Sequence, residues 1–186
     1  MSKYFPITTY GMDILRQETK QIQEVDLDLV KVIHKMFETM HNADGIGLAA
    51  PQVNIPVALT VIDISGDDDY KNIKPLTLIN PEIVETHGKI EREEGCLSMP
   101  GLRAIVTRPE KIFFKYYDID MKEQEMEADK LLSRVVQHEI DHLHGKLFID
   151  YLDEEQMKEL KAELRDIKNK NIETFYPLYI HSELEY

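Results

Sequence analysis

The sequence predicts an α+β fold in which mostly antiparallel sheets pack around a central helix, with an N-terminal helix and a C-terminal helix beside them. Two observations support this prediction. Apolar residues recur at helical spacing in three separate segments, and short runs rich in β-branched and aromatic residues stand between the first and second of these. Turn-forming residues separate the runs at 66–69, 88 and 108–109, as expected for neighbouring antiparallel strands.

Three helices follow from apolar spacing and end signals. The first begins behind Asp26, a suitable N-cap, stops near 42–45, and has an apolar face of Leu29, Val30, Ile33, Met36, Phe37 and Met40. The central helix is predicted from Asp129 to about His144, with Gly145 as its stop. The third covers roughly 153–169 and has an apolar face of Met157, Leu160, Leu164 and Ile167. The predicted strands are 57–64, 76–84, 103–106 and 111–120.

Composition and charge limit the class of protein. The chain has 186 residues, of which 42% are hydrophobic and 31% charged, so we expect one globular domain rather than a disordered or fibrous chain. Its net charge of −13 repels nucleic acids and anionic membranes unless a local basic patch intervenes. No stretch approaches the ~18 apolar residues of a membrane span, and the first residues lack the pattern of a secretory signal. We therefore expect a cytoplasmic protein with no membrane contact. We also expect a monomer.

The central helix contains a metal-binding pattern. His138 and His142 lie four residues apart on one helix face, where two imidazoles can share one metal ion. In metallohydrolases with this spacing, the glutamate beside the first histidine, here Glu139, takes a proton from the attacking water. The simpler interpretation is a charged helix face with ordinary surface histidines.

A catalytic metal site needs a third protein ligand. The histidine that long-motif zinc proteases place after the helix is replaced by Phe148. A zinc endopeptidase that takes Glu159 or Glu163 as its ligand therefore stays open, and the competing ligand is Cys96, the only cysteine. A lone cysteine is more often buried filler. A non-enzymatic structural metal module also stays open, although it needs a fourth ligand and His144 points to a different helix face.

A third segment, GIGLAAPQ at 45–52, follows the first helix. Its small residues allow a backbone to come close to a ligand, and the amide of Gln52 can donate a hydrogen bond. The spacing is not that of a phosphate-binding loop. Alone, the segment indicates no more than a tight turn.

Together and in this order, GIGLAAPQ, EGCLS at 94–98 and HEIDH at 138–142 resemble the three signature motifs of the peptide deformylase family. The resemblance implies a hydrolase that removes the formyl group from the N-terminal methionine of nascent polypeptides and releases formate. It covers most of the chain, so we expect residues 1–150 to form the catalytic domain, with a C-terminal helix and tail over 151–186 attached to it.

The resemblance also implies roles for individual residues. The metal ligands are Cys96, His138 and His142, and the general base is Glu139. Gln52 and the backbone N–H of Leu97 are the oxyanion donors. The metal is one divalent ion, with Fe(II) implied as native and Zn(II), Ni(II) or Co(II) as occupants of the isolated protein.

For the substrate, the resemblance implies that backbone groups of Ile46, Gly47 and Gly95 hold the peptide as an added strand. It further implies an apolar methionine pocket lined by Leu131 and Val135, with Ile46 as a further lining residue. Arg134 does not suit such a pocket. Either its stem lines the rim while its charge reaches solvent, or the pocket tolerates polar side chains.

Work on nascent chains implies a place near the ribosome. Four basic residues recur at helical spacing on the predicted C-terminal helix: Lys158, Lys161, Arg165 and Lys168. We call these four residues the basic ridge, and they offer a contact with ribosomal RNA. Glutamates lie among them, however, and faces of mixed charge are usually solvated surface.

Overall fold

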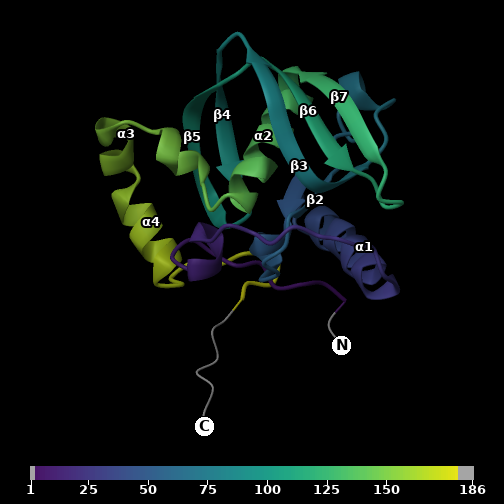
Figure 1. Cartoon of the computed structure of the whole chain (residues 1–186). Helices are drawn as coiled ribbons and strands as arrows, with labels where there is room; N and C mark the ends of the chain where they lie inside the picture. The colour runs from purple at the N-terminus through teal and green to yellow at the C-terminus, as the bar shows by residue number, and fades with distance from the viewer. Residues whose placement is uncertain (1–2, 180–186) are drawn as a thin grey trace.

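The structure is a computed structural model that describes residues 3–179, and it places two antiparallel sheets on either side of a central helix (Figure 1). The larger sheet has the order β1-β2-β3-β6-β7 and the smaller sheet pairs β4 with β5. The strands are β1 (Gly47–Ala49), β2 (Leu59–Ile62), β3 (Leu76–His87), β4 (Ile90–Cys96), β5 (Met99–Arg108), β6 (Lys111–Tyr117) and β7 (Glu123–Asp129). The central helix is α2 (Lys130–Leu143). The predicted α+β class is confirmed.

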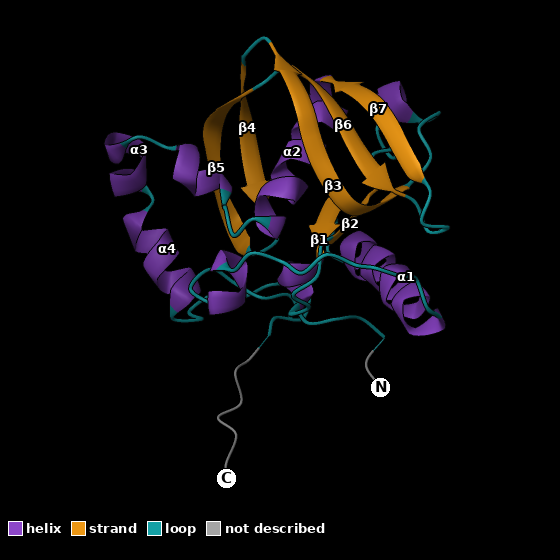
Figure 2. Ribbon diagram, viewed as in Figure 1, coloured by secondary structure: helices purple, strands orange, loops and turns teal. Residues whose placement is uncertain are grey.

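The main core lies between α2 and the larger sheet. Val136 and Ile140 of α2 pack in one cluster with Ile112 and Phe114 of β6, and all four are buried. The opposite face of α2 turns towards the smaller sheet (Figure 2). A helix enclosed in this way can carry polar side chains into a buried site while its apolar face holds the domain together.

The N-terminal helix is α1 (Leu27–Asn42), and its predicted start is confirmed. The Asp26 side chain accepts a hydrogen bond from the backbone N–H of Leu29 at 2.7 Å, as an N-cap does. Met36 and Met40 are fully buried in a cluster with residues of β1 and β2. This packing fixes the segment that leaves the helix at 43–46 and enters β1.

Three strands were not predicted: β1, β4 and β7. Both β4 and β7 are rich in charged residues, which disfavour strands by propensity, and their exposed faces keep those charges in water. Each pairs along its whole length with a neighbour that was predicted, β4 with β5 and β7 with β6. Hydrogen bonding to a neighbouring strand therefore outweighs the low strand propensity of the charged residues in β4 and β7.

The predicted third helix is two helices, α3 (Glu154–Glu159) and α4 (Lys161–Lys168), with Leu160 between them. Leu164 and Ile167 are buried in a cluster with residues of β5, so the apolar face packs as expected. Short 3-10 helices complete the chain: η1 (Asp13–Arg16), η2 (Ala50–Val53), η3 (Asp68–Tyr70) and η4 (Phe148–Tyr151). In the part of the chain that the structure describes, no helix is long and apolar enough to cross a membrane.

After α4 the chain returns to the N-terminal segment. The backbone N–H of Ile7 donates to the Pro177 carbonyl, and the N–H of Tyr179 donates to the Ile7 carbonyl, both at 2.8 Å. Residues 171–179, which we call the C-terminal segment, are thus attached to the N-terminal segment around Ile7. Residues 180–186 of the predicted tail lie outside the described residues.

Candidate metal centre

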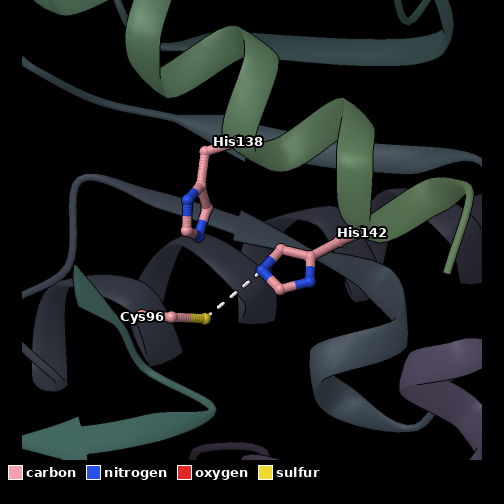
Figure 3. Close-up of side chains that lie close together, drawn as sticks. All are labelled: Cys96, His138 and His142. Atoms are coloured by element: carbon pink, nitrogen blue, oxygen red, sulfur yellow. Dashed lines mark hydrogen bonds between the residues drawn. The ribbon is translucent and has the colours of Figure 1, made fainter. Parts of the chain in front are cut away.

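Cys96, His138 and His142 come together at the end of the smaller sheet (Figure 3). The two histidines project from α2 and the cysteine ends β4, and their ligand atoms all lie within 4.8 Å of one another. Cys96 Sγ is 3.3 Å from His142 Nε2. Among residues 3–179 this is the one such group of histidine, cysteine and acidic side chains. A thiol and two imidazoles form a donor set for a transition metal ion.

A buried carboxylate orients the first histidine. His138 Nδ1 lies 3.0 Å from Glu94 Oε2, so the other ring nitrogen, Nε2, is left for the centre. Glu94 is itself 5% exposed. A metal-binding histidine usually donates its second N–H to such a partner, which fixes both the tautomer and the ring orientation.

Glu94 is held in turn by Arg108. The Arg108 guanidinium donates to both Glu94 oxygens, at 2.5 and 3.0 Å, and its Nη1 donates to Asp141 Oδ2 at 2.7 Å. Burial by itself would raise the pKa of Glu94, but the hydrogen bonds from His138 and Arg108 outweigh it and lower that pKa to about 2. Glu94 is therefore a fixed anion behind the centre.

His142 has a different environment. Its Nδ1 is buried and has no hydrogen-bond partner among the described residues. The two histidines share a helix, yet a charged network holds the His138 ring from behind, whereas the only hydrogen-bond contact of the His142 ring among the described residues is with Cys96 Sγ.

Glu139 lies beside the cluster, 3% exposed, and its Oε2 is buried without a hydrogen-bond partner in the described part of the chain. Burial raises the pKa of Glu139 to about 7. The close approach depends on Gly47, because a Cβ at that position would lie 2.8 Å from Glu139 Cδ. The GIGLAAPQ segment therefore packs directly against the HEIDH motif of α2.

Gln52, 1% exposed, aims its amide nitrogen at the same point. Its Oε1 accepts a hydrogen bond from the backbone N–H of Ala49 at 2.8 Å, which fixes the two ends of the amide. Its Nε2 therefore faces Cys96 Sγ at 3.4 Å and donates to Ser98 Oγ at 3.2 Å. This N–H group is preorganised rather than free to rotate.

These side chains open on a cavity of about 580 Å³. Every predicted site residue except His142 lines it, namely Ile46, Gly47, Gln52, Gly95, Cys96, Leu97, Leu131, Val135, His138 and Glu139. The predicted residues, drawn from segments far apart in the sequence, thus meet at one place.

The expectation that the Arg134 charge reaches solvent is wrong. Arg134 is 5% exposed, and its guanidinium donates to Glu94 Oε1 at 2.5 Å and to the carbonyls of Val106 at 3.0 Å and Ile90 at 2.8 Å. The residue also lines the cavity. The buried anion Glu94 draws the charged head inward, so the apolar stem is the part left for the cavity wall.

The residues of the alternative sites lie elsewhere. Glu159 and Glu163 are exposed on α3 and α4 and are not members of the cluster. His144 is exposed and lies 3.3 Å from Glu18. Within residues 3–179, neither a glutamate nor a third histidine joins Cys96, His138 and His142 in the cluster.

Sequence reasoning missed four residues of this region: Glu94, Arg108, Phe175 and Tyr176. Glu94 belongs to the EGCLS segment, and its position next to a ligand motif was an available signal. The sequence predicts Arg108 only as part of a turn. Phe175 and Tyr176 line the cavity from the C-terminal segment, and nothing in their sequence context marks them.

Comparison with known proteins gives a consistent result. A family model described as polypeptide deformylase matches residues 4–158. The peptide deformylase of Chlorobium phaeovibrioides is 47% identical over 173 residues, covering 93% of this chain and 91% of that protein. That of Salinibacter ruber is 47% identical over 181 residues and covers 93% of each. The crystal structure of a peptide deformylase from Legionella pneumophila matches with a TM-score of 0.82 at 39% identity, covering 90% of this chain and 97% of that one.

Proposed function

The chain belongs to the polypeptide deformylase family and removes the N-formyl group of nascent peptides, and on this premise we propose which of its residues perform each step. The observation that carries the assignment is the cluster of Cys96, His138 and His142 beside Glu139, whose Oε2 is buried without a hydrogen-bond partner in the described part of the chain. The roles below are assigned from that geometry.

Cys96, His138 and His142 would hold one divalent ion. A thiolate and two neutral imidazoles fit Fe(II), Zn(II), Ni(II) or Co(II), and three protein ligands leave a position open for substrate, as catalytic sites require. We propose Fe(II) as the native ion. When bound, the ion lowers the pKa of a water and polarises the formyl carbonyl.

Glu139 is the proposed general base. It takes a proton from water as the water oxygen bonds to the formyl carbon, and it returns that proton to the amide nitrogen as the C–N bond breaks. The products are formate and a free N-terminal amine. The absence of a hydrogen-bond partner on Glu139 Oε2 in the described structure supports this role, because nothing competes for the proton.

Gln52 and Leu97 are the proposed oxyanion donors. The Gln52 amide nitrogen faces the cluster, and Leu97 lies next to Cys96 in the cavity wall. Hydrogen-bond donors fixed in place act where charge develops on the formyl oxygen. Leu97 contributes through its backbone N–H, so its side chain is free to pack.

The peptide is proposed to bind as an extra strand between β1 and the end of β4. The strand β1 stands at the edge of the larger sheet, and the backbone of Gly47 and Gly95 lines the cavity from its two sides. Ile46 directly precedes β1, and its carbonyl accepts a hydrogen bond from the backbone N–H of Asp63 at 3.0 Å, which fixes the start of the strand. The methionine side chain would lie against Leu131 and Val135 of α2.

Formate release tests the proposal. Anaerobically prepared protein should release formate from formyl-Met-Ala, with about one equivalent of metal per chain. Acetyl-Met-Ala is the matched control substrate, and its hydrolysis at a similar rate would contradict selectivity for formyl. A metal-loaded protein that leaves formyl-Met-Ala intact would contradict the assigned roles.

We further propose that the basic ridge contacts the ribosome. Lys158, Lys161, Arg165 and Lys168 are exposed and line one groove of about 550 Å³, together with Tyr10, Glu154, Met157 and Leu164. Four cations beside one carboxylate give this groove a net positive charge, opposite to the overall charge of −13, which suits a phosphate backbone.

Co-sedimentation with ribosomes tests this contact. Replacing the four ridge residues with glutamine should abolish binding and leave deformylation of dipeptides intact, and wild-type binding should weaken steeply with salt. The matched control replaces four exposed lysines outside the groove, Lys71, Lys74, Lys89 and Lys122, with glutamine. Equal loss in both variants would indicate a general charge effect and contradict the ridge.

We also propose the compartment, the oligomeric state and the domain organisation of the chain. We propose the cytoplasm as the compartment and a monomer as the working form. We also propose that residues 1–150 form the catalytic domain and that 151–186 belong to the same folding unit. The pairing of Ile7 with Pro177 and Tyr179 supports the last of these for the described residues.

A further inference from the structure

The C-terminal segment reaches the active-site cavity. Phe175 and Tyr176 both line the cavity that contains Cys96, His138 and Glu139. The family model ends at residue 158, so the wall that these two aromatic residues form lies outside the matched region. The reaction as derived above uses neither of them.

Tyr176 fixes this segment to the catalytic motifs. Its hydroxyl donates to the carbonyl of Leu97 at 2.9 Å, directly after the ligand Cys96. Its ring is 8% exposed and packs with Ile7 and Ala43. Backbone hydrogen bonds of Pro177 and Tyr179 with Ile7 hold the segment just after Tyr176 as well, so residue 175 has a defined place beside the cavity.

Phe175 is 70% exposed although it is a large apolar side chain. It contacts the Tyr176 ring edge to face, with centroids 5.2 Å apart and an interplanar angle of 87°. Phenylalanine has only two side-chain torsions, so its ring loses little conformational entropy when it takes up an apolar ligand. Exposure alone would be ordinary, but exposure on the wall of a substrate cavity provides a contact surface.

We propose that Phe175 is a specificity-determining residue that contacts apolar side chains at the second and third positions of the formyl-methionyl peptide. This inference rests on the proposed placement of formyl at the metal centre and of methionine against α2. An extended peptide advances by about 3.3–3.6 Å per residue, so the following residues lie towards the rim. There the exposed ring of Phe175 offers an apolar surface that the side chains of leucine residues can contact and that a glycine residue, without a side chain, cannot.

Kinetics with two peptides test the inference. The ratio of kcat/KM for formyl-Met-Leu-Leu to that for formyl-Met-Gly-Gly should fall roughly tenfold in Phe175→Ala, the loss of one partly buried apolar contact. The control variant is Ile119→Ala, which removes an exposed apolar side chain far from the cavity wall. A ratio in Phe175→Ala equal to that of the wild type would overturn the inference. Wild-type protein inert towards both peptides would instead overturn the proposed function.

A fluorescence measurement provides a readout independent of catalysis. The chain contains no tryptophan, so Phe175→Trp places a single reporter at the rim. Its emission should shift to shorter wavelength on titration with the product peptide Met-Leu-Leu, and Ile119→Trp should not respond. Product inhibition of Phe175→Trp by Met-Leu-Leu without any change in emission would overturn the contact.

Discussion

The metal end of the cavity and its entrance are built in different ways. At the metal end, Gln52, Cys96, His138 and Glu139 all belong to three short motifs, and the contacts that fix them join one motif to another, as between His138 and Glu94. At the entrance, Arg134, Phe175 and Tyr176 belong to no motif and owe their positions to distant partners. Tertiary contacts therefore assemble both ends, but sequence motifs mark the residues of the metal end, whereas no motif marks the residues of the wall that meets the rest of the substrate.

This comparison predicts two kinds of variant. Changes at the metal end should lower the rate for every formyl peptide alike, because the reacting atoms are common to all of them. Changes at the entrance should be smaller and should depend on the peptide or on fold stability.

The largest effect is expected for Cys96→Ala. Two histidines alone leave the ion with too few protein ligands, so the purified variant should retain no stoichiometric metal and no deformylase activity. Metal analysis after anaerobic purification measures this, with Phe175→Ala as the control that should keep its metal. Full metal occupancy in Cys96→Ala would contradict the three-ligand centre.

Glu139→Ala should come next, with a loss of about 10² to 10⁴ in kcat, the usual range for a general base. Because Glu139 is not a proposed ligand, metal content should stay at the wild-type level. Loss of metal together with activity would show that the carboxylate supports the ion rather than the proton transfer. The same fold-loss is expected for formyl-Met-Leu-Leu and formyl-Met-Gly-Gly.

Gln52→Leu should reduce kcat by roughly 10² to 10³ with little change in KM, since the amide meets charge that develops only in the transition state. Circular dichroism should show an unchanged fold, because leucine has a similar volume. An effect confined to KM would make Gln52 a binding residue and weaken the distinction between the two ends.

Glu94→Gln tests whether the buried carboxylate of Glu94 orients His138 at the metal centre. Loss of the anion that orients His138 should cost about 10- to 100-fold in metal affinity or activity, as for other partners of metal-bound histidines. Competition with a chelator measures the affinity, and thermal unfolding checks that the variant is folded. Metal affinity equal to that of the wild type would mean that packing alone orients His138.

The smallest effect on rate is expected for Arg134→Met. Arg108 still holds Glu94, so kcat should change only a few-fold, whereas the carbonyls of Ile90 and Val106 lose their partner. Unsatisfied buried groups of this kind cost about 1–3 kcal/mol in the free energy of unfolding. Denaturant unfolding measures that loss, and a drop in kcat as large as that of Glu94→Gln would place Arg134 at the metal end instead.

The sequence by itself was sufficient for the α+β class, for α1 and α2, and for the three motifs. Helical periodicity and the Asp26 cap are local properties, and the four-residue spacing of His138 and His142 puts both on one helix face whatever surrounds it. The charged strands β4 and β7 were missed because pairing with β5 and β6 forms them against their own propensity.

Only the tertiary structure decided where long side chains and the C-terminal segment end up. The Arg134 head turns inward because Glu94, 40 residues away in the sequence, offers a buried anion and nearby carbonyls complete its hydrogen bonds. Tyr176 reaches Leu97 across 79 residues. Local periodicity carries no information about such partners, because the free energy of these contacts arises only once distant segments have been brought together.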